Sequence, residues 1–259
     1  YWWEWGHRQL GRTLGLVFAV PFAFFLWKGR IAPRLRPRMW VLFGLGGLQG
    51  AIGWWMVSSG LSERLDVSQY RLATHLSMAF VILGLTLWTA LEVRYGAAAF
   101  RQAGRLTRPA ALFWALVLVQ IALGAFVAGL DAGRIHTTWP LMHGQLIPEG
   151  YLSGMPFWQA IFESRPAVQL HHRWTGYIAA IAAGALAFAL HRTGEPLLQR
   201  AGYVVAGVTA LQIVLGVSTL VHAAPLNLSL LHQGGAIALF LAAGTTTWLA
   251  ARVSRLPVQ

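Results

Sequence analysis

The chain has 259 residues, of which 56% are hydrophobic and only 11% are charged, and its mean hydropathy is +0.55. Soluble domains carry about 25% charged residues, so the composition excludes a water-soluble globular protein and predicts an all-α protein integral to a membrane. No cysteine is present, which excludes disulfides and thiolate metal sites.

Seven apolar segments each approach the roughly 20 residues that a helix needs to cross a bilayer. In chain order they cover residues 7–27, 39–58, 72–91, 110–129, 172–190, 201–221 and 228–251. A longer connection, residues 130–167, separates the fourth segment from the fifth. Long loops in compact proteins often act as lids, so we expect this outer loop to cover a bound group or to dock a partner.

The net charge of +12 is concentrated in alternate connections and at the C-terminus. The cations concerned are Lys28, Arg30, Arg34, Arg36, Arg38, Arg94, Arg101, Arg105, Arg108, Arg192, Arg200, Arg252 and Arg255. Cytoplasmic loops of membrane proteins carry such an excess of Lys and Arg. The distribution therefore predicts a cytoplasmic C-terminus and an outer position for Tyr1, and it argues against a nucleic-acid partner.

One pattern recurs in LQGAIGWWMVSSGL, VQIALGAFVAGLDAG and LQIVLGVSTLVHAAP. In each copy a glutamine is followed four residues later by a glycine: Gln49 and Gly53, Gln120 and Gly124, Gln212 and Gly216. A single copy is most simply a helix-packing motif. Segments that begin with a histidine alternate with the copies, which indicates a tandem duplication into halves at residues 1–109 and 110–259. The second half has four predicted helices and the first has three, so we expect a further helix before Tyr1.

Four histidines lie near the starts of helices that enter from the outer side: His7, His75, His172 and His232. The repeat pairs His7 with His75 and His172 with His232, one pair in each bundle-like half. Any one of them could be a hydrogen-bonded interfacial residue, but four equivalent positions favour ligands. Two facing imidazoles suit haem iron, whereas zinc needs about four clustered donors. His171 is a competing ligand beside His172.

Glu4 precedes His7 by three residues, and Gln169 holds the equivalent position before His172. A carboxylate can accept a proton or stabilise positive charge, which an amide does poorly. The asymmetry predicts a catalytic site in the first half and a redox cofactor site in the second. Arginines adjoin both sites and are candidates for contacts to haem propionates, or are interfacial cations: Arg8, Arg12, Arg71 and Arg173.

The stretches WEWGHRQLGR, LQGAIGWWMVSSGL, YRLATHLSMA, AGLDAGRIHTTWPLMHGQLIP, VQLHHRW and LLHQGGA run nearly end to end. In this order they resemble the haem A synthase family, which implies eight helices in two tandem four-helix halves. The resemblance implies that Glu4 is catalytic, that His7 and His75 flank the substrate haem, and that His172 and His232 ligate a haem B cofactor. It further implies that a methyl group of haem O is oxidised to a formyl group, giving haem A for terminal oxidases.

The chain departs from the family at His171, where Asp is common, and at His143, where Asp is also common. The absence of cysteine resembles the proteobacterial and mitochondrial type, which implies a bacterial inner membrane with the haem sites towards its outer side. Expected partners are lipid, haem O, the farnesyl-transferring enzyme that supplies it, and a second copy of the chain. The alternatives are a dihaem b-type electron carrier, which Glu4 disfavours, and a transporter with histidines on a proton path.

Overall fold

The computed structural model describes residues 2–58, 67–96 and 104–253. Seven of the helices in this part are long and apolar enough to cross a membrane. They are α1 (Trp2–Trp27), α2 (Arg36–Ser58), α3 (Gln69–Tyr95), α4 (Thr107–Gly129), α6 (Arg165–His191), α7 (Pro196–Val221) and α8 (Leu226–Val253). The predicted all-α membrane class is therefore confirmed, and each predicted segment lies within one of these helices.

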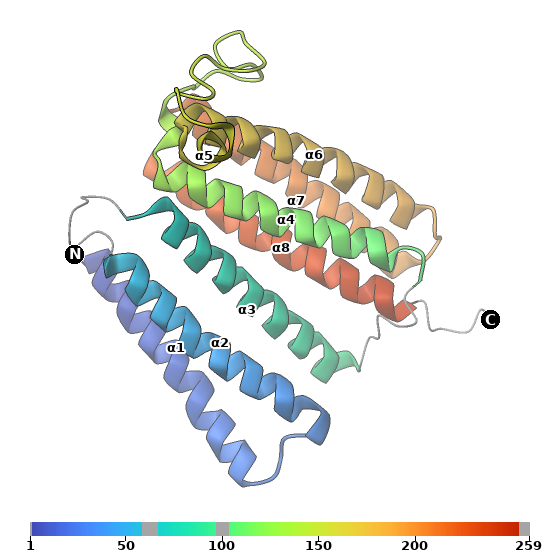
Figure 1. The fold of residues 1–259 in the computed structure, drawn as a ribbon. Coiled ribbons are helices and arrows are strands. Elements are labelled where there is room, and N and C mark those ends of the chain that lie inside the picture. Colours follow the sequence, from blue (N-terminus) through green and yellow to red (C-terminus); the bar gives the residue numbers. More distant parts are fainter. Residues whose placement is uncertain (1, 59–66, 97–103, 254–259) are drawn as a thin grey trace.

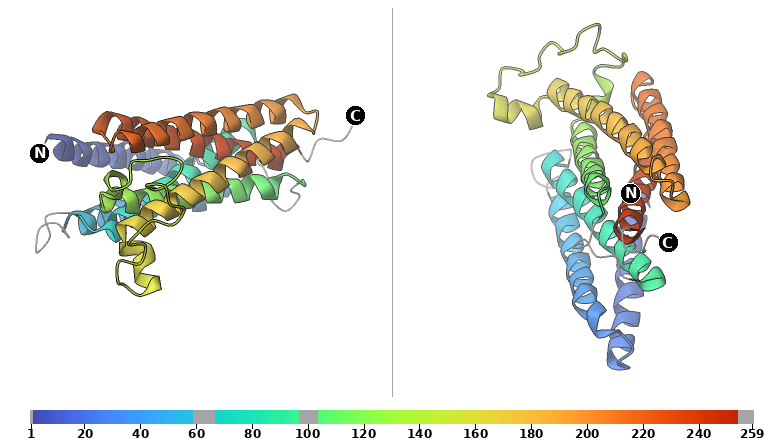
Figure 2. Two further views of the ribbon diagram at one scale, coloured as in Figure 1. Left: turned by 90° about the horizontal axis from the view of Figure 1, so that it is seen from above. Right: turned by 90° about the vertical axis from the view of Figure 1, so that its right-hand side faces the viewer.

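The long helices run side by side along the molecule (Figures 1 and 2). Helices α1, α3, α6 and α8 all begin at the end of the bundle where the N-terminus and the long outer loop lie (Figure 1). Helices α2, α4 and α7 finish at that same end. The topology therefore brings four helix starts, each with one of the predicted histidines, to one end of the molecule.

The core lies among α3, α4, α6, α7 and α8. Its buried residues are Phe80, Ala110, Phe113, Val117, Ile121, Ala183, Leu186, Leu190, Leu198, Val205, Leu239, Phe240, Ala243 and Ala250. Glycine allows the closest approaches: a Cβ at Gly84 of α3 would lie 2.9 Å from Cζ2 of Trp114 in α4. Because α3 contacts both α4 and α8, the predicted first half packs directly on the second.

Helices α1 and α2 form the outer edge of the bundle, where α2 contacts α3 and α1 contacts α2. Only Phe22 of α1 and Leu42 of α2 are buried. Phe22 packs against Trp40 with ring centroids 4.9 Å apart. An ion pair between Arg38 and the buried carboxylate of Glu92 joins α2 to α3 at the end opposite the histidines.

The outer loop contains more structure than the predicted range 130–167. A 3₁₀ turn covers Ala132–Arg134, and the short helix α5 covers Phe157–Glu163. Helix α6 begins at Arg165, seven residues before the predicted apolar segment, because the Ser164 side chain caps it and Pro166 occupies its first turn. The predicted boundary at 109/110 falls in the first turn of α4. Arg101 and Arg255 lie outside the described residues.

Candidate functional site

Two pairs of histidines face each other at the same end of the bundle. His7 of α1 and His75 of α3 have ring centroids 6.4 Å apart, with an angle of 71° between the ring planes. His172 of α6 and His232 of α8 have the same centroid separation of 6.4 Å and an angle of 86°. The structure therefore brings together the two pairs that the repeat predicts.

The spacing in both pairs fits one metal ion between two imidazoles. With a metal–nitrogen bond of roughly 2.0–2.1 Å on each side, the ring centroids would lie about 6.3 Å apart. In the part of the chain that the structure describes, no group of three or more His, Cys, Asp or Glu side chains could hold a metal ion. A two-imidazole site suits an ion whose remaining ligands come with it, as the porphyrin nitrogens of haem do.

The two pairs differ in their surroundings. His7 is exposed, whereas His75, His172 and His232 are partly buried. Glu4, one turn before His7, has 57% of its side chain exposed and forms an ion pair with Arg8. Its counterpart Gln169 is only 2% exposed. The carboxylate thus stands at an open site and the amide at a covered one.

Gln169 also has a structural role that sequence reasoning missed. Its Nε2 donates to the main-chain oxygen of His136 in the outer loop at 3.0 Å. Comparison of the two halves predicts for Gln169 only that a carboxylate is absent. Its acceptor is a main-chain atom 33 residues away, and no local sequence signal identifies such a partner.

The four candidate arginines have different partners. Arg12 donates to Gln9 at 3.2 Å, and Arg8 is paired with Glu4. Arg71 donates to the main-chain oxygen of Trp55 at 2.6 Å. Its guanidinium also lies 4.6 Å from the Trp55 ring centroid, so it holds the end of α2 against α3.

Arg173 binds the outer loop. It donates to the main-chain oxygens of His136 at 2.6 Å and Thr138 at 2.9 Å. Its Nε–H is buried and donates to no partner within the described residues. Arg173 thereby ties the outer loop to α6 one residue after His172.

His171 points towards the loop rather than towards α8. Its Nε2 lies 2.9 Å from the hydroxyl of Tyr151. The facing partner of His232 is therefore His172. His172, the predicted ligand, and His171, its competitor, are thus adjacent on α6 but contact different partners.

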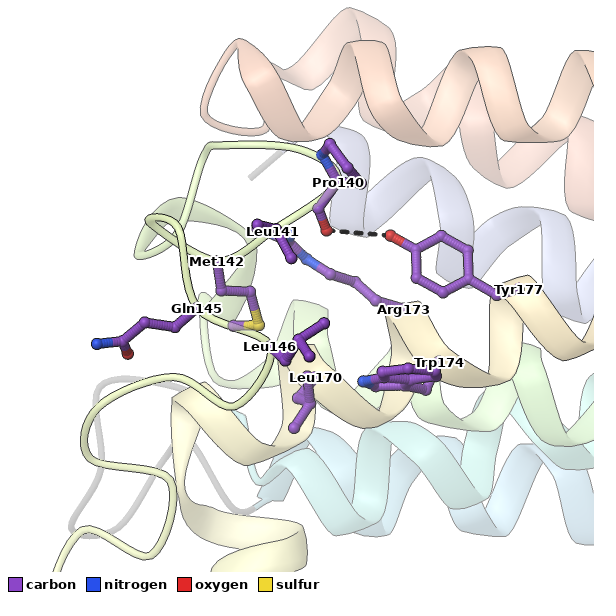
Figure 3. A pocket seen from close by; sticks show the side chains of 9 residues that line it. All are labelled: Pro140, Leu141, Met142, Gln145, Leu146, Leu170, Arg173, Trp174 and Tyr177. Carbon is purple, nitrogen blue, oxygen red and sulfur yellow. Dashed lines mark hydrogen bonds between the residues drawn. The ribbon is translucent and has the colours of Figure 1, made fainter.

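A cavity of about 100 Å³ lies between the outer loop and α6 (Figure 3). Its lining consists of Pro140, Leu141, Met142, Gln145, Leu146, Leu170, Arg173, Trp174 and Tyr177. The hydroxyl of Tyr177 donates to the main-chain oxygen of Pro140 at 3.2 Å, which fixes the loop above the cavity. The Arg173 side chain extends from α6 along this cavity (Figure 3).

The two outer-loop histidines form a pair of their own. Nδ1 of His136 lies 3.2 Å from Nδ1 of His143. Partial burial lowers the pKa of His136 below its usual value, and the nearby His143 and Arg173 lower this pKa further. A neutral His136 is therefore the form that suits the observed loop.

Comparison with known proteins places this chain in a family. Residues 1–243 match the model of the family described as cytochrome oxidase assembly protein. A relative from Maricaulis maris is 58% identical over 252 residues, which are 97% of this chain and 74% of that protein. A relative from Bradyrhizobium diazoefficiens is 46% identical over 257 residues, covering 98% and 71% of the two chains. A third, from Caulobacter, is 47% identical over 251 residues, covering 96% and 73%. All three are named "Heme A synthase".

Proposed function

The chain belongs to the haem A synthase family of cytochrome oxidase assembly proteins, and from this membership we propose that it is an enzyme that oxidises a methyl group of haem O to the formyl group of haem A. The observation that carries the proposal is the pair of equal 6.4 Å histidine spacings, one in each half. Two facing histidine pairs at the same end of the bundle suit one substrate haem and one electron-transferring cofactor.

We assign the cofactor, a haem B, to His172 and His232. These two residues are partly buried, and the neutral Gln169 on α6 binds the outer loop three residues before His172. A covered site without a nearby carboxylate suits a permanent group. When bound there, haem B supplies one-electron transfer.

We assign the substrate haem to His7 and His75. His7 is exposed and lies on α1, a helix at the edge of the bundle with few buried residues. A substrate could therefore enter and leave from the membrane. Glu4 and His7 lie on one face of α1, because residues three apart on a helix are neighbours. The assignment therefore places an ionisable carboxylate beside the reacting haem.

Glu4 is the residue that we propose for catalysis. Conversion of a methyl group and one water to a formyl group releases four electrons and four protons. A carboxylate near the methyl carbon stabilises positive charge as electrons leave and accepts a released proton. Arg8 forms an ion pair with this carboxylate in the present structure.

The arginines also suit the propionates of the two haems. Arg8 and Arg12 lie on α1, and Arg71 precedes His75 by one turn. Arg173 has a buried Nε without a partner in the described structure. We propose these side chains as the propionate contacts, with the present loop contacts of Arg173 retained through its terminal nitrogens.

We propose a bacterial inner-membrane location with a cytoplasmic C-terminus. The described cations in the connections from α1 to α2, from α3 to α4 and from α6 to α7 lie at the end of the bundle opposite the outer loop (Figure 1). The positive-inside rule then directs that end to the cytoplasm and the histidines outwards. The farnesyl-transferring enzyme and a second copy of the chain remain the proposed protein partners.

The direct test is to express the chain in a host that lacks haem A but makes haem O, and to extract the haems. Haem A in the extract supports the proposal. Haem B bound to the purified protein without any haem A would favour the dihaem electron carrier.

A further inference from the structure

A glutamine on the preceding Gln-x-x-x-Gly helix binds the main chain of three of the four histidines. Nε2 of Gln49 donates to the main-chain oxygen of His75 at 3.1 Å. Gln120 makes the same contact with His172 at 2.9 Å, and Gln212 makes it with His232 at 2.8 Å. The helix pairs are α2 with α3, α4 with α6, and α7 with α8, so the contact recurs in both halves.

The glycine of each copy lies against the imidazole of the same histidine. A Cβ at Gly53 would lie 2.9 Å from Cε1 of His75. The corresponding distances are 3.1 Å between Gly124 and His172, and 2.9 Å between Gly216 and His232. Any side chain at these positions would displace the ring, so glycine is required for where the ring lies and not only for helix packing.

The glutamine amide also touches the ring. Nε2 of Gln49 lies 3.2 Å from Nδ1 of His75 and 3.4 Å from its Nε2. The amide nitrogen is therefore nearly equidistant from the two ring nitrogens. Nε2 of Gln120 lies 3.4 Å from Nε2 of His172. The glutamine thus limits rotation of the imidazole about the Cβ–Cγ bond of the histidine.

Unpaired atoms in these contacts match what a metal-bound imidazole needs. The Oε1 atoms of Gln49, Gln120 and Gln212 are buried and have no hydrogen-bond partner in the described structure. Nδ1 is likewise buried and unpartnered in His172 and His232. An imidazole whose Nε2 binds metal carries its proton on Nδ1 and donates it to a neighbouring acceptor. Each glutamine carries a buried, unpartnered acceptor atom in the same amide group that contacts its histidine.

A small residue one turn after the histidine makes room for the glutamine. A Cβ at Gly176 would lie 3.2 Å from Nε2 of Gln120, and one at Gly235 would lie 2.1 Å from Oε1 of Gln212. Gly11 holds the same position after His7, but a Cβ there meets nothing within 4 Å in the described structure. Among the described residues, His7 therefore has no such support.

We propose that each Gln-x-x-x-Gly copy is a cradle that fixes the position and rotation of one haem-ligating histidine. Glutamine and glycine are positioning residues here, since they act through the imidazole. The inference rests on the proposed haem sites and deepens them, because it assigns a role to a motif that sequence reasoning explains by packing alone.

The first experiment compares Gly216→Ala with Gly207→Ala in the purified full chain. Both glycines lie on α7, but only Gly216 is against a histidine, and a Cβ at Gly207 meets nothing within 4 Å. We expect Gly216→Ala to weaken haem B binding about tenfold or more, the usual effect of losing a ligand's supporting contact. We also expect a shift in the g-values of its low-spin ferric haem by electron paramagnetic resonance. Gly207→Ala should match the unmodified chain in both measurements.

The second experiment uses two adjacent glycines on α8. Gly235→Ala should displace the Gln212 amide, whereas Gly234→Ala meets open space. Gly235→Ala should therefore reproduce the haem spectrum of Gln212→Leu, and Gly234→Ala should not. These three variants separate loss of the glutamine contact from general disturbance of the helix.

The outcomes distinguish the cradle from the proposed function. Unchanged haem affinity and g-values in Gly216→Ala, Gly235→Ala and Gln212→Leu would overturn the cradle, while haem in all these proteins would leave the proposed function intact. If the unmodified chain binds no haem when haem is supplied, the proposed haem sites are wrong and the cradle's role falls with them.

Discussion

The imidazole of His172 faces that of His232 with ring centroids 6.4 Å apart, and the outer loop is bound to α6 immediately beside them. His7 and His75 have the same separation on the exposed edge of the bundle. Equal spacing indicates similar ligation in both pairs. The difference in burial indicates unequal retention of what they bind, and this difference can be measured.

Removal of one histidine from each pair should have unequal effects on bound haem. We expect His232→Ala to lose nearly all of its haem B, because a buried site then keeps only one axial ligand. His75→Ala should keep close to the haem B content of the unmodified chain, since the covered pair is intact. Haem content per chain after purification gives the comparison, and an equal loss from the two variants would contradict the assignment of the covered pair to the cofactor.

Arg173 should stabilise the outer loop. Its two hydrogen bonds to main-chain oxygens are charge-assisted, and bonds of this kind contribute about 1.5–3 kcal/mol each. Arg173→Leu should therefore lower the unfolding temperature and increase cleavage of the loop in limited proteolysis. Arg134→Leu is the matched control, because its ion pair with Asp131 is mostly exposed and such pairs contribute about 0–1 kcal/mol. Equal cleavage of both variants would show that Arg173 does not hold the loop.

Acidification should destabilise the loop through His136. The folded state lowers the pKa of His136, mainly through burial, so the unfolded loop binds more protons as the pH falls. The stabilisation is thus present above the ordinary histidine pKa of about 6.5 and is lost as the pH falls through the lowered pKa. His143 and Arg173 are the charged or titratable groups that lower it further. Unfolding temperatures between pH 7.5 and 5 should fall more steeply for the unmodified chain than for His136→Asn, and parallel curves would exclude this role.

The ion pair between Arg38 and Glu92 should anchor α2 to α3. Glu92 is 8% exposed, and removing one partner from a buried pair costs about 3–5 kcal/mol because the other charge is left uncompensated. Arg38 is partly exposed, so we expect Arg38→Met to reach only the lower end of this range. The double variant Arg38→Met with Glu92→Gln should recover much of the loss. Thermal unfolding in detergent tests this, and additive destabilisation in the double variant would show that the two groups do not interact.

Much of the fold could be predicted from apolar length alone, because a bilayer requires about 20 apolar residues for each helix. The apolar criterion fails at polar helix starts, which is why α6 begins at Arg165 and not at 172. Ser164 followed by Pro166 is a helix-start signal that would have placed this boundary. The sequence does not predict helix α5, because its seven residues, with exposed Phe157 and Trp158, are too few for a membrane-spanning pattern.

The candidate site was predictable as far as the repeat extends. Equivalent positions of His7, His75, His172 and His232 predict the two facing pairs that the structure contains. Contacts to main-chain atoms of distant segments were not predictable, because every residue offers the same carbonyl group as an acceptor. The bonds of Gln169 and Arg173 to the outer loop belong to this class.

Glu4 is the residue on which the proposed chemistry depends, and the most direct measurement compares Glu4→Gln with Glu149→Gln. Glu149 is an exposed carboxylate in the outer loop and serves as the control. Each protein is produced with an enzyme that makes haem O, and the haems are extracted and separated by chromatography. We predict haem A from the unmodified chain and from Glu149→Gln, but haem O or a hydroxylated intermediate from Glu4→Gln. Equal amounts of haem A from all three would contradict a catalytic Glu4, and haem B alone from all three would contradict the synthase activity itself.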